Sequence, residues 1–140
     1  MYVIIAGCGR VGAGMALQLS AEGHDVVVID EFPGAFRLLG EDFPGQRLVG
    51  AAIDWDVLVE AGIEGADAFA AVTDGDNTNI VCALLAARGF EVPCAVARVY
   101  DPLRAKAFAK LGIRTVCPTE NARVLMVEQI YQCPAASTEV

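Results

Sequence analysis

The stretch from Tyr2 to Asp30 constrains the fold of this chain more than any other segment. It opens with an apolar run, Tyr2–Ala6, that is long enough for one buried strand. Three glycines follow at the spacing G-x-G-x-x-G, namely Gly7, Gly9 and Gly12. The next residues predict a helix, and Asp25–Asp30 then predicts a second buried strand with a carboxylate at its tip. Strand, glycine turn, helix, strand and acid in this order are typical of a dinucleotide-binding unit.

Each part of this unit has a separate physical role. Gly7 lets the chain turn sharply out of the first strand, and Gly9, which has no Cβ, allows a pyrophosphate to approach the backbone closely. Gly12 lets the helix pack near the preceding strand. The first N–H groups of that helix have no partner within it, and the helix dipole adds positive charge there, so the turn predicts an anion site. Asp30, about 20 residues beyond the turn, is expected to accept hydrogen bonds from ribose hydroxyls.

Two further groups of polar residues bear on the ligand. Glu31 places a second carboxylate beside Asp30. Because a 2′-phosphate would meet negative charge there, NAD or another adenine nucleotide is expected in preference to NADP. The run from Thr73 to Asn77 follows a predicted strand, and the carboxyl ends of strands form the edge at which open parallel sheets bind ligands.

The rest of the chain continues the alternation of strand and helix. The predicted strands are Tyr2–Ala6, Asp25–Asp30, Arg47–Val49, Ala66–Val72, Pro93–Val99 and Thr115–Cys117. The predicted helices run from Val11 towards Gly23, over Phe32–Leu39, from Asp54 to Gly62, over Asn79–Arg88, from Pro102 to Gly112 and over Pro118–Tyr131. This alternation predicts an α/β fold, a Rossmann-like doubly wound parallel six-stranded sheet with helices on both faces. We divide the chain into a nucleotide-binding domain, residues 1–117, and a terminal helix with its tail, residues 118–140.

Helical periodicity predicts which residues of the helices face the core. The first helix carries an apolar face at i, i+4 and i+8, and the fifth carries another. These residues are Val11, Met15 and Leu19 in the first helix, and Leu103, Ala107 and Leu111 in the fifth. The last helix has apolar residues around much of its circumference, a pattern that requires burial on more than one side. We therefore expect that helix to pack against a second copy of the chain, giving a homodimer.

Composition excludes several classes of protein. The formal net charge is −8, which argues against a nucleic-acid-binding or anionic-membrane surface. No apolar run reaches the roughly 18 residues needed to span a bilayer, and no signal peptide is recognisable, so we expect a cytoplasmic protein. The five cysteines form no zinc or disulfide pattern, and no metal site is expected. Most cysteines should pack as small apolar residues, including Cys8, although a helix N-terminus beside it could lower its pKa.

The pattern favours a binding protein over an enzyme, with two alternatives open. Hydride transfer needs a substrate pocket and usually an acid or base. His24, the single histidine, lies between the first helix and the second strand, at the edge of the sheet away from the ligand. No Tyr-x-x-x-Lys pair and no substrate domain are recognisable. A small NAD-dependent oxidoreductase is thus one alternative, and a dimeric redox or energy sensor is another.

Several runs resemble the TrkA-N domain, the nucleotide-binding lobe of RCK (regulator of potassium conductance) proteins. These runs are GCGRVG at 7–12, VVVID at 26–30, LVGAAIDWDVLVEAGI at 48–63, ADAFAAVTDGDNTN at 66–79, ARVYDP at 97–102 and LGIRTVCPTE at 111–120. The resemblance implies a cytoplasmic regulatory lobe that binds NAD(H), or ATP, ADP or AMP, and pairs into dimers or rings. It further implies a membrane potassium channel or transporter subunit as partner, which would hold the lobe at the periphery of the inner membrane without direct insertion.

The resemblance also implies roles for individual residues. The glycines and Arg10 would hold phosphates, and Asp30 would hold the adenosine ribose. Asp54 lies near the family's usual aspartate in a G-D-A run, which here reads Gly50-Ala51-Ala52-Ile53-Asp54. Arg98 would face a phosphate or a partner subunit. The expected site residues are Gly7, Cys8, Gly9, Arg10, Val11, Gly12, Asp30, Glu31, Asp54, Thr73, Asp74 and Arg98.

Overall fold

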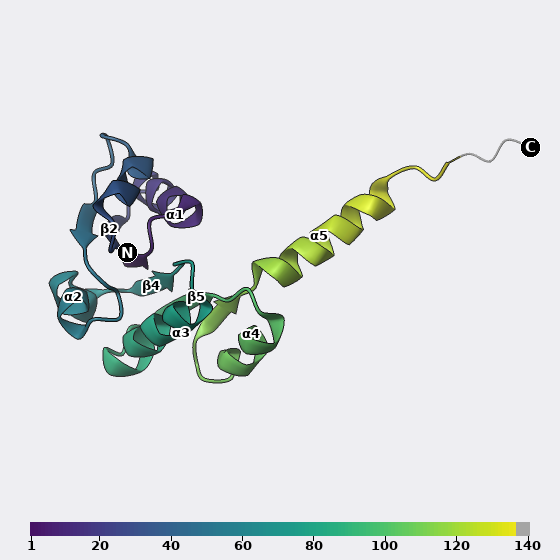
Figure 1. The fold of residues 1–140 in the computed structure, drawn as a ribbon. Helices are drawn as coiled ribbons and strands as arrows, with labels where there is room; N and C mark the ends of the chain where they lie inside the picture. Colours follow the sequence, from purple (N-terminus) through teal and green to yellow (C-terminus); the bar gives the residue numbers. More distant parts are fainter. Residues whose placement is uncertain (137–140) are drawn as a thin grey trace, which may run out of the picture.

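A computed structural model describes residues 1–136 (Figure 1). The strands are β1 (Tyr2–Ala6), β2 (Asp25–Asp30), β3 (Gln46–Val49), β4 (Ala68–Ala71), β5 (Cys94–Arg98) and β6 (Arg114–Val116). The α-helices are α1 (Arg10–Ala21), α2 (Trp55–Glu60), α3 (Asp76–Leu84), α4 (Pro102–Ala109) and α5 (Pro118–Gln132). Shorter helical segments are η1 (Pro33–Leu39), η2 (Ile63–Gly65) and η3 (Leu85–Gly89), of which η3 is a π-helical continuation of α3.

The six strands form one sheet in the order β3-β2-β1-β4-β5-β6. Every neighbouring pair of strands is parallel. The chain runs outward from β1 to β3 and then returns to continue from β4 on the other side of β1. The space between the carboxyl ends of β1 and β4 is therefore the topological switch point, where open α/β sheets bind ligands. The predicted doubly wound α/β fold is confirmed.

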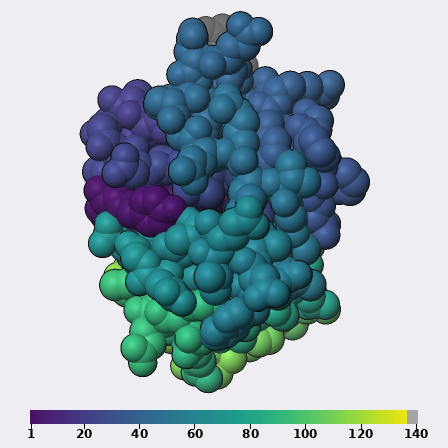
Figure 2. All heavy atoms as spheres, turned by 90° about the vertical axis from the view of Figure 1, so that its left-hand side faces the viewer, coloured from purple at the N-terminus to yellow at the C-terminus, as the bar shows by residue number. Residues whose placement is uncertain are grey.

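Side chains of β1 alternate between two cores, one on each face of the sheet. Val3 and Ile5 pack with residues of α1 and η1, whereas Ile4 and Ala6 pack with residues of α2, α3 and α4. Buried parallel strands of this kind read as continuous apolar runs because both of their faces are covered. In Figure 2 the N-terminal segments of the chain (purple and blue) lie above, and the later segments (teal and green) lie below and in contact with them.

The predicted core face of α1 is confirmed only in part. Its buried residues are Gly12, Ala13 and Ala16, whereas Val11 is 47% exposed. These small residues let the helix axis come close to the sheet. They therefore make the contact with the sheet, and the larger side chains of the helix lie to either side of them. Met15 and Leu19 are partly buried at the edge of this contact.

The predicted core face of α4 is wrong. Ala105 is buried and Phe108 packs partly against the core, but Leu103 is 78% exposed. The helix is anchored by its N-cap as predicted, because the Asp101 carboxylate accepts a hydrogen bond from the backbone N–H of Leu103 at 3.0 Å. The side of the helix that carries Ala105 and Phe108 faces the core, and the side that carries Leu103 faces solvent.

Element boundaries differ from the prediction by a few residues. The strand expected over Ala66–Val72 is confined to β4, and α3 begins at Asp76 instead of Asn79. The early start of α3 is stabilised by the Asp76 carboxylate, which accepts hydrogen bonds from the backbone N–H groups of Tyr100 and Asp101. The cap expected at Asp54 is confirmed, since its carboxylate accepts from the N–H of Asp56 at 2.8 Å.

Helix α5 projects away from the rest of the chain (Figure 1). None of its residues is buried, although it carries large apolar side chains. These are Val124, Leu125, Met126, Val127, Ile130 and Tyr131, with exposed fractions between 37% and 83%. The terminal segment predicted over 118–140 includes residues that lie outside the described part of the chain.

Candidate functional site

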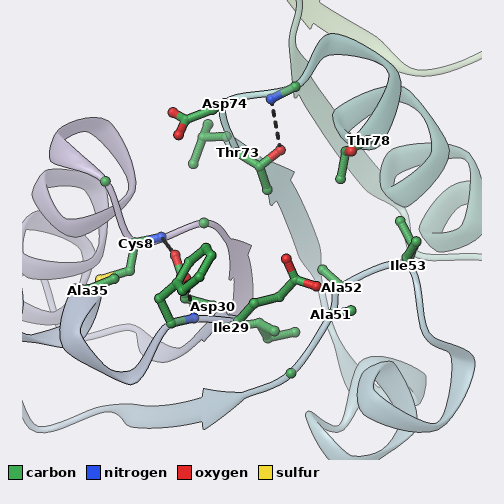
Figure 3. Close-up of a pocket in the computed structure, with 17 residues that line it drawn as sticks. Cys8, Ile29, Asp30, Ala35, Ala51, Ala52, Ile53, Thr73, Asp74 and Thr78 are labelled. Carbon is green, nitrogen blue, oxygen red and sulfur yellow. Dashed lines mark hydrogen bonds between the residues drawn. The ribbon is translucent and has the colours of Figure 1, made fainter.

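A cavity of about 440 Å³ lies at the switch point, where the carboxyl ends of β1, β2 and β4 meet. Its lining comes from segments far apart in the sequence (Figure 3). The lining residues are Gly7, Cys8, Gly9, Ile29, Asp30, Glu31, Phe32, Ala35, Gly50, Ala51, Ala52, Ile53, Val72, Thr73, Asp74, Gly75 and Thr78. The glycine loop and Asp30 at the end of β2 are thus brought together, as the sequence predicts.

The three glycines of the loop meet different constraints. Gly7 has φ +106°, and a Cβ placed there would lie 2.8 Å from the carbonyl oxygen of Val72. A Cβ on Gly12 would lie 1.9 Å from the carbonyl oxygen of Gly7, so close packing of α1 on the loop requires glycine. A Cβ on Gly9 would meet nothing within 4 Å. The backbone at Gly9 is therefore open to a ligand, as a pyrophosphate requires.

The first turn of α1 offers hydrogen-bond donors at this opening. Within residues 1–136, no protein acceptor takes the backbone N–H groups of Gly9, Arg10, Val11 or Gly12, whereas the N–H of Ala13 donates to the carbonyl of Gly9. Helix N-termini leave such groups unpaired, and the helix dipole makes them an attractive site for an anion. The donor set fits a phosphate or pyrophosphate group.

The Asp30 carboxylate holds the loop in place. One of its oxygens accepts from the backbone N–H of Cys8 at 2.8 Å, and the other accepts from the N–H of Phe32 at 2.9 Å. Figure 3 shows the first of these bonds joining the tip of β2 to the loop. A carboxylate has about four lone-pair sites, so each oxygen retains capacity to accept from a ligand hydroxyl. Glu31, next in the chain, is exposed and also lines the cavity.

Cys8 is a packing residue in this structure. Only 1% of it is exposed, and its side chain belongs to the core beneath α1. Burial and the negative charge of Asp30 raise the pKa of the Cys8 thiol above its ordinary value. The thiol is therefore neutral near pH 7, contrary to the lowering that a helix N-terminus alone would produce.

A buried polar network supports the opposite wall of the cavity. The Asn79 side chain is fully buried, and its Oδ1 accepts from the backbone N–H of Thr73 at 2.8 Å and from the Thr73 hydroxyl at 2.6 Å. Its Nδ2 donates to the carbonyl oxygens of Thr73 at 3.0 Å and Arg98 at 2.9 Å. The network therefore ties the end of β4 to the end of β5.

Arg98 belongs to the same network and does not line the cavity. It is only 9% exposed, its Nη2 donates to the carbonyl oxygens of Val72 at 3.2 Å and Thr73 at 3.0 Å, and its guanidinium lies over the Tyr100 ring. Its Nε has no hydrogen-bond partner among residues 1–136. Arg98 thus stabilises the backbone at Val72 and Thr73 from the side that faces away from the cavity.

The structure divides the expected site residues into two groups. Those that line the cavity are Gly7, Cys8, Gly9, Asp30, Glu31, Thr73 and Asp74. Those outside its lining are Arg10, Val11, Gly12, Asp54 and Arg98. Sequence reasoning missed Asn79, whose position just after the Thr73–Asn77 run was the available signal. It also missed the apolar wall formed by Gly50–Ile53, Phe32 and Ala35.

The family model of the TrkA-N domain matches residues 3–119. The chain belongs to the TrkA-N domain family. It is 52% identical over 116 residues to the Trk system potassium uptake protein TrkA of Streptomyces coelicolor, covering 83% of this chain and 52% of that protein. It is 39% identical over 111 residues to a TrkA homolog of Pyrococcus abyssi, covering 79% of this chain and 49% of the relative. The chain thus spans about half the length of these relatives.

Solved structures share this fold. The Kef C-terminal domain of Shewanella denitrificans in its AMP-bound form superposes with a TM-score of 0.81 at 26% identity, covering 99% of this chain and 85% of that chain. The GsuK channel bound to NAD superposes with a TM-score of 0.70 at 19% identity, covering 84% of this chain and 21% of that chain. At that identity, the second comparison shows the fold alone.

Residues 1–136 contain neither a candidate membrane span nor a candidate metal-binding cluster. No helix in that range combines the length and the apolar character that a membrane crossing requires. No group of three or more His, Cys, Asp and Glu side chains in the same range is arranged to hold a metal ion. His24 lies at the turn between α1 and β2, where its Nδ1 is 3.0 Å from the amino terminus.

Proposed function

We propose that this chain is a regulatory nucleotide-binding domain of a potassium uptake or channel system, and that it binds an adenine nucleotide in the switch-point cavity. NAD(H) is the first candidate ligand, with ATP, ADP and AMP as the others. The observation that carries the proposal is that Gly9 and Asp30 line one cavity, beside the start of α1, whose first backbone N–H groups have no protein acceptor within residues 1–136. The names of the TrkA relatives and the AMP in the Kef domain support it.

The cavity suggests how such a ligand would lie. The N–H groups at Arg10 and Val11 would hold the phosphates, with the exposed Arg10 side chain adding positive charge. Asp30 would accept from the ribose hydroxyls, as its remaining lone pairs allow. The apolar wall at Ala51–Ile53 would contact the base. Arg98 would act on the ligand only through Thr73.

A binding role fits this cavity better than a catalytic one. Hydride transfer would require an acid or base at the substrate, and His24 lies at the amino edge of the sheet, away from the cavity. Regulation requires that two ligand states bind two conformations of the protein with different affinity. The domain would act in the cytoplasm, next to a membrane potassium transport subunit.

Loss of the Asp30 carboxylate is expected to weaken nucleotide binding by about 10- to 100-fold, because hydrogen bonds to a charged acceptor contribute about 1.5–3 kcal/mol. Calorimetric titration of the purified chain with NAD, NADH, NADPH, ATP, ADP and AMP would measure this for the wild type and Asp30→Ala. Glu64→Ala is the control, since Glu64 is exposed and lies outside the cavity.

Asp30→Ala could weaken binding by removing a contact to the ribose or by loosening the glycine loop, and deoxynucleotides distinguish the two causes. The wild type should bind AMP more tightly than 2′-deoxy-AMP, and Asp30→Ala should reduce that difference. An unchanged difference would place the ribose away from Asp30. Absence of binding by every nucleotide would contradict the proposed function.

We also infer that α5 packs in a homodimer, because its exposed apolar residues spread around the helix. Ile130→Glu should raise the dimer dissociation constant at least about tenfold, since burying an unpaired charge costs several kcal/mol. Analytical ultracentrifugation would compare it with Gln129→Glu, which adds the same charge at a neighbouring polar position. A monomeric wild type, or equal effects of both substitutions, would contradict this arrangement.

A further inference from the structure

The charged side chains that line the cavity are all acidic. Asp30, Glu31 and Asp74 line it, and no lysine, arginine or histidine of residues 1–136 does so. Asp30 and Glu31 lie at the end of β2, whereas Asp74 lies beyond β4, on the other side of the glycine loop (Figure 3). The chain as a whole adds to this negative potential with a net charge of −8.

The wall beyond β4 presents hydrogen-bond acceptors. The Thr73 hydroxyl proton is committed to Asn79 Oδ1 at 2.6 Å, so the hydroxyl has only acceptor capacity left for a ligand. Asp74 next to it is exposed and carries a carboxylate, which also only accepts. A ligand group that meets these two side chains must therefore be a donor, such as a sugar hydroxyl. The Thr78 hydroxyl also lines the cavity and can donate, but it is neutral and does not offset the negative charge of Asp74.

The positively charged groups nearby do not neutralise the negative charge of this wall. The Arg98 guanidinium lies behind it and donates to the carbonyl oxygens of Val72 and Thr73. The N-terminus of α3 could attract a phosphate, but Asp76 already occupies its first turn and Asp74 lies just before it. The exposed Arg10 stands at the start of α1, where the pyrophosphate of any of these ligands would lie.

We propose that this wall makes the site selective for nucleotides whose pyrophosphate is extended by a hydroxyl-bearing sugar, and that it disfavours a third phosphate. The inference rests on the proposed function, because it places the ribose at Asp30 and the pyrophosphate at α1. The extension beyond the pyrophosphate then meets Thr73 and Asp74. A dinucleotide offers ribose hydroxyls to those acceptors, whereas ATP offers further negative charge.

The probes for this inference are ADP, ATP, ADP-ribose and NAD, titrated with EDTA present so that no divalent cation neutralises the third phosphate. ADP-ribose carries the second sugar without the nicotinamide, so it isolates the contact in question. We expect ADP-ribose and NAD to bind about tenfold more tightly than ADP, because the second sugar adds hydrogen bonds. We expect ATP to bind more weakly than ADP, because its third phosphate is repelled by the carboxylates.

The variant that tests the wall is Asp74→Asn, which removes the charge of an exposed side chain that makes no hydrogen bond within residues 1–136. It should narrow the ratio of ATP to ADP-ribose dissociation constants by about fivefold, and the wild-type ratio should also shrink at high salt. Glu64→Gln removes the same charge outside the cavity and should leave the ratio unchanged.

The outcomes separate this inference from the proposed function. Binding of ATP at least as tight as that of ADP-ribose would overturn the inference while leaving nucleotide binding in place. A ratio unchanged in Asp74→Asn would overturn it as well. Absence of binding by all four probes would overturn the proposed function and this inference with it.

Discussion

Replacing Gly12 with alanine is expected to lower the free energy of unfolding by about 3 kcal/mol or more, and the melting temperature by roughly 10 °C. The new Cβ would lie 1.9 Å from the carbonyl oxygen of Gly7 and 2.9 Å from its carbonyl carbon. Both are backbone atoms of a loop fixed by Asp30, so neither can move away as a flexible side chain would. Relief requires α1 to shift from the sheet, which would open the core around Ala13 and Ala16.

The matched control lies in the same helix. Gly14 is exposed, and a Cβ there would meet nothing within 4 Å. Gly14→Ala should therefore raise stability by about 0.5–1 kcal/mol, because alanine favours the helix relative to glycine. Thermal and urea unfolding of both variants would measure the contrast. Equal effects of the two substitutions would show that α1 does not pack on the loop through Gly12.

The same contact explains which parts of the fold could be predicted from the sequence. The positions of the strands and the placement of Asp30 follow from local patterns, since buried strands, glycine turns and helix stops are each encoded within a few residues. The core face of α1 was predicted only in part, because periodicity gives weight to large side chains, of which Met15 and Leu19 pack partly against the core but Val11 is exposed. Close approach of the helix at Gly12 instead buried the small residues beside it.

The candidate site shows a similar division. The glycine loop and Asp30 form a unit continuous in sequence, so their meeting in one cavity could be predicted. The apolar wall at Gly50–Ile53 comes from a loop whose position depends on how α2 packs. Asn79 binds Thr73, which follows β4, and Arg98, which ends β5, and no periodicity links these residues. Contacts among separate segments of this kind require the folded structure.

Asn79→Ala is the second substitution for which a large effect is expected, a loss of about 3 kcal/mol in the free energy of unfolding. It removes the four hydrogen bonds by which Asn79 joins Thr73 to Arg98. The backbone N–H of Thr73 and the carbonyl of Arg98 would lose these partners in a buried environment, and unsatisfied groups cost more than the average hydrogen bond contributes. A small cavity adds to the loss.

The control for this substitution is Asn77→Ala in the same helix. Asn77 is exposed, and its Oδ1 accepts from Arg104 at 3.1 Å on the surface, so its loss should cost less than about 0.5 kcal/mol. Urea unfolding would compare the two variants, and equal losses would show that the Asn79 network does not stabilise the fold. Because Asn79 also orients the Thr73 hydroxyl, folded Asn79→Ala should discriminate less between ADP-ribose and ATP than Asn77→Ala does. A stability loss without that change would mean that the Thr73 hydroxyl is oriented without the help of Asn79.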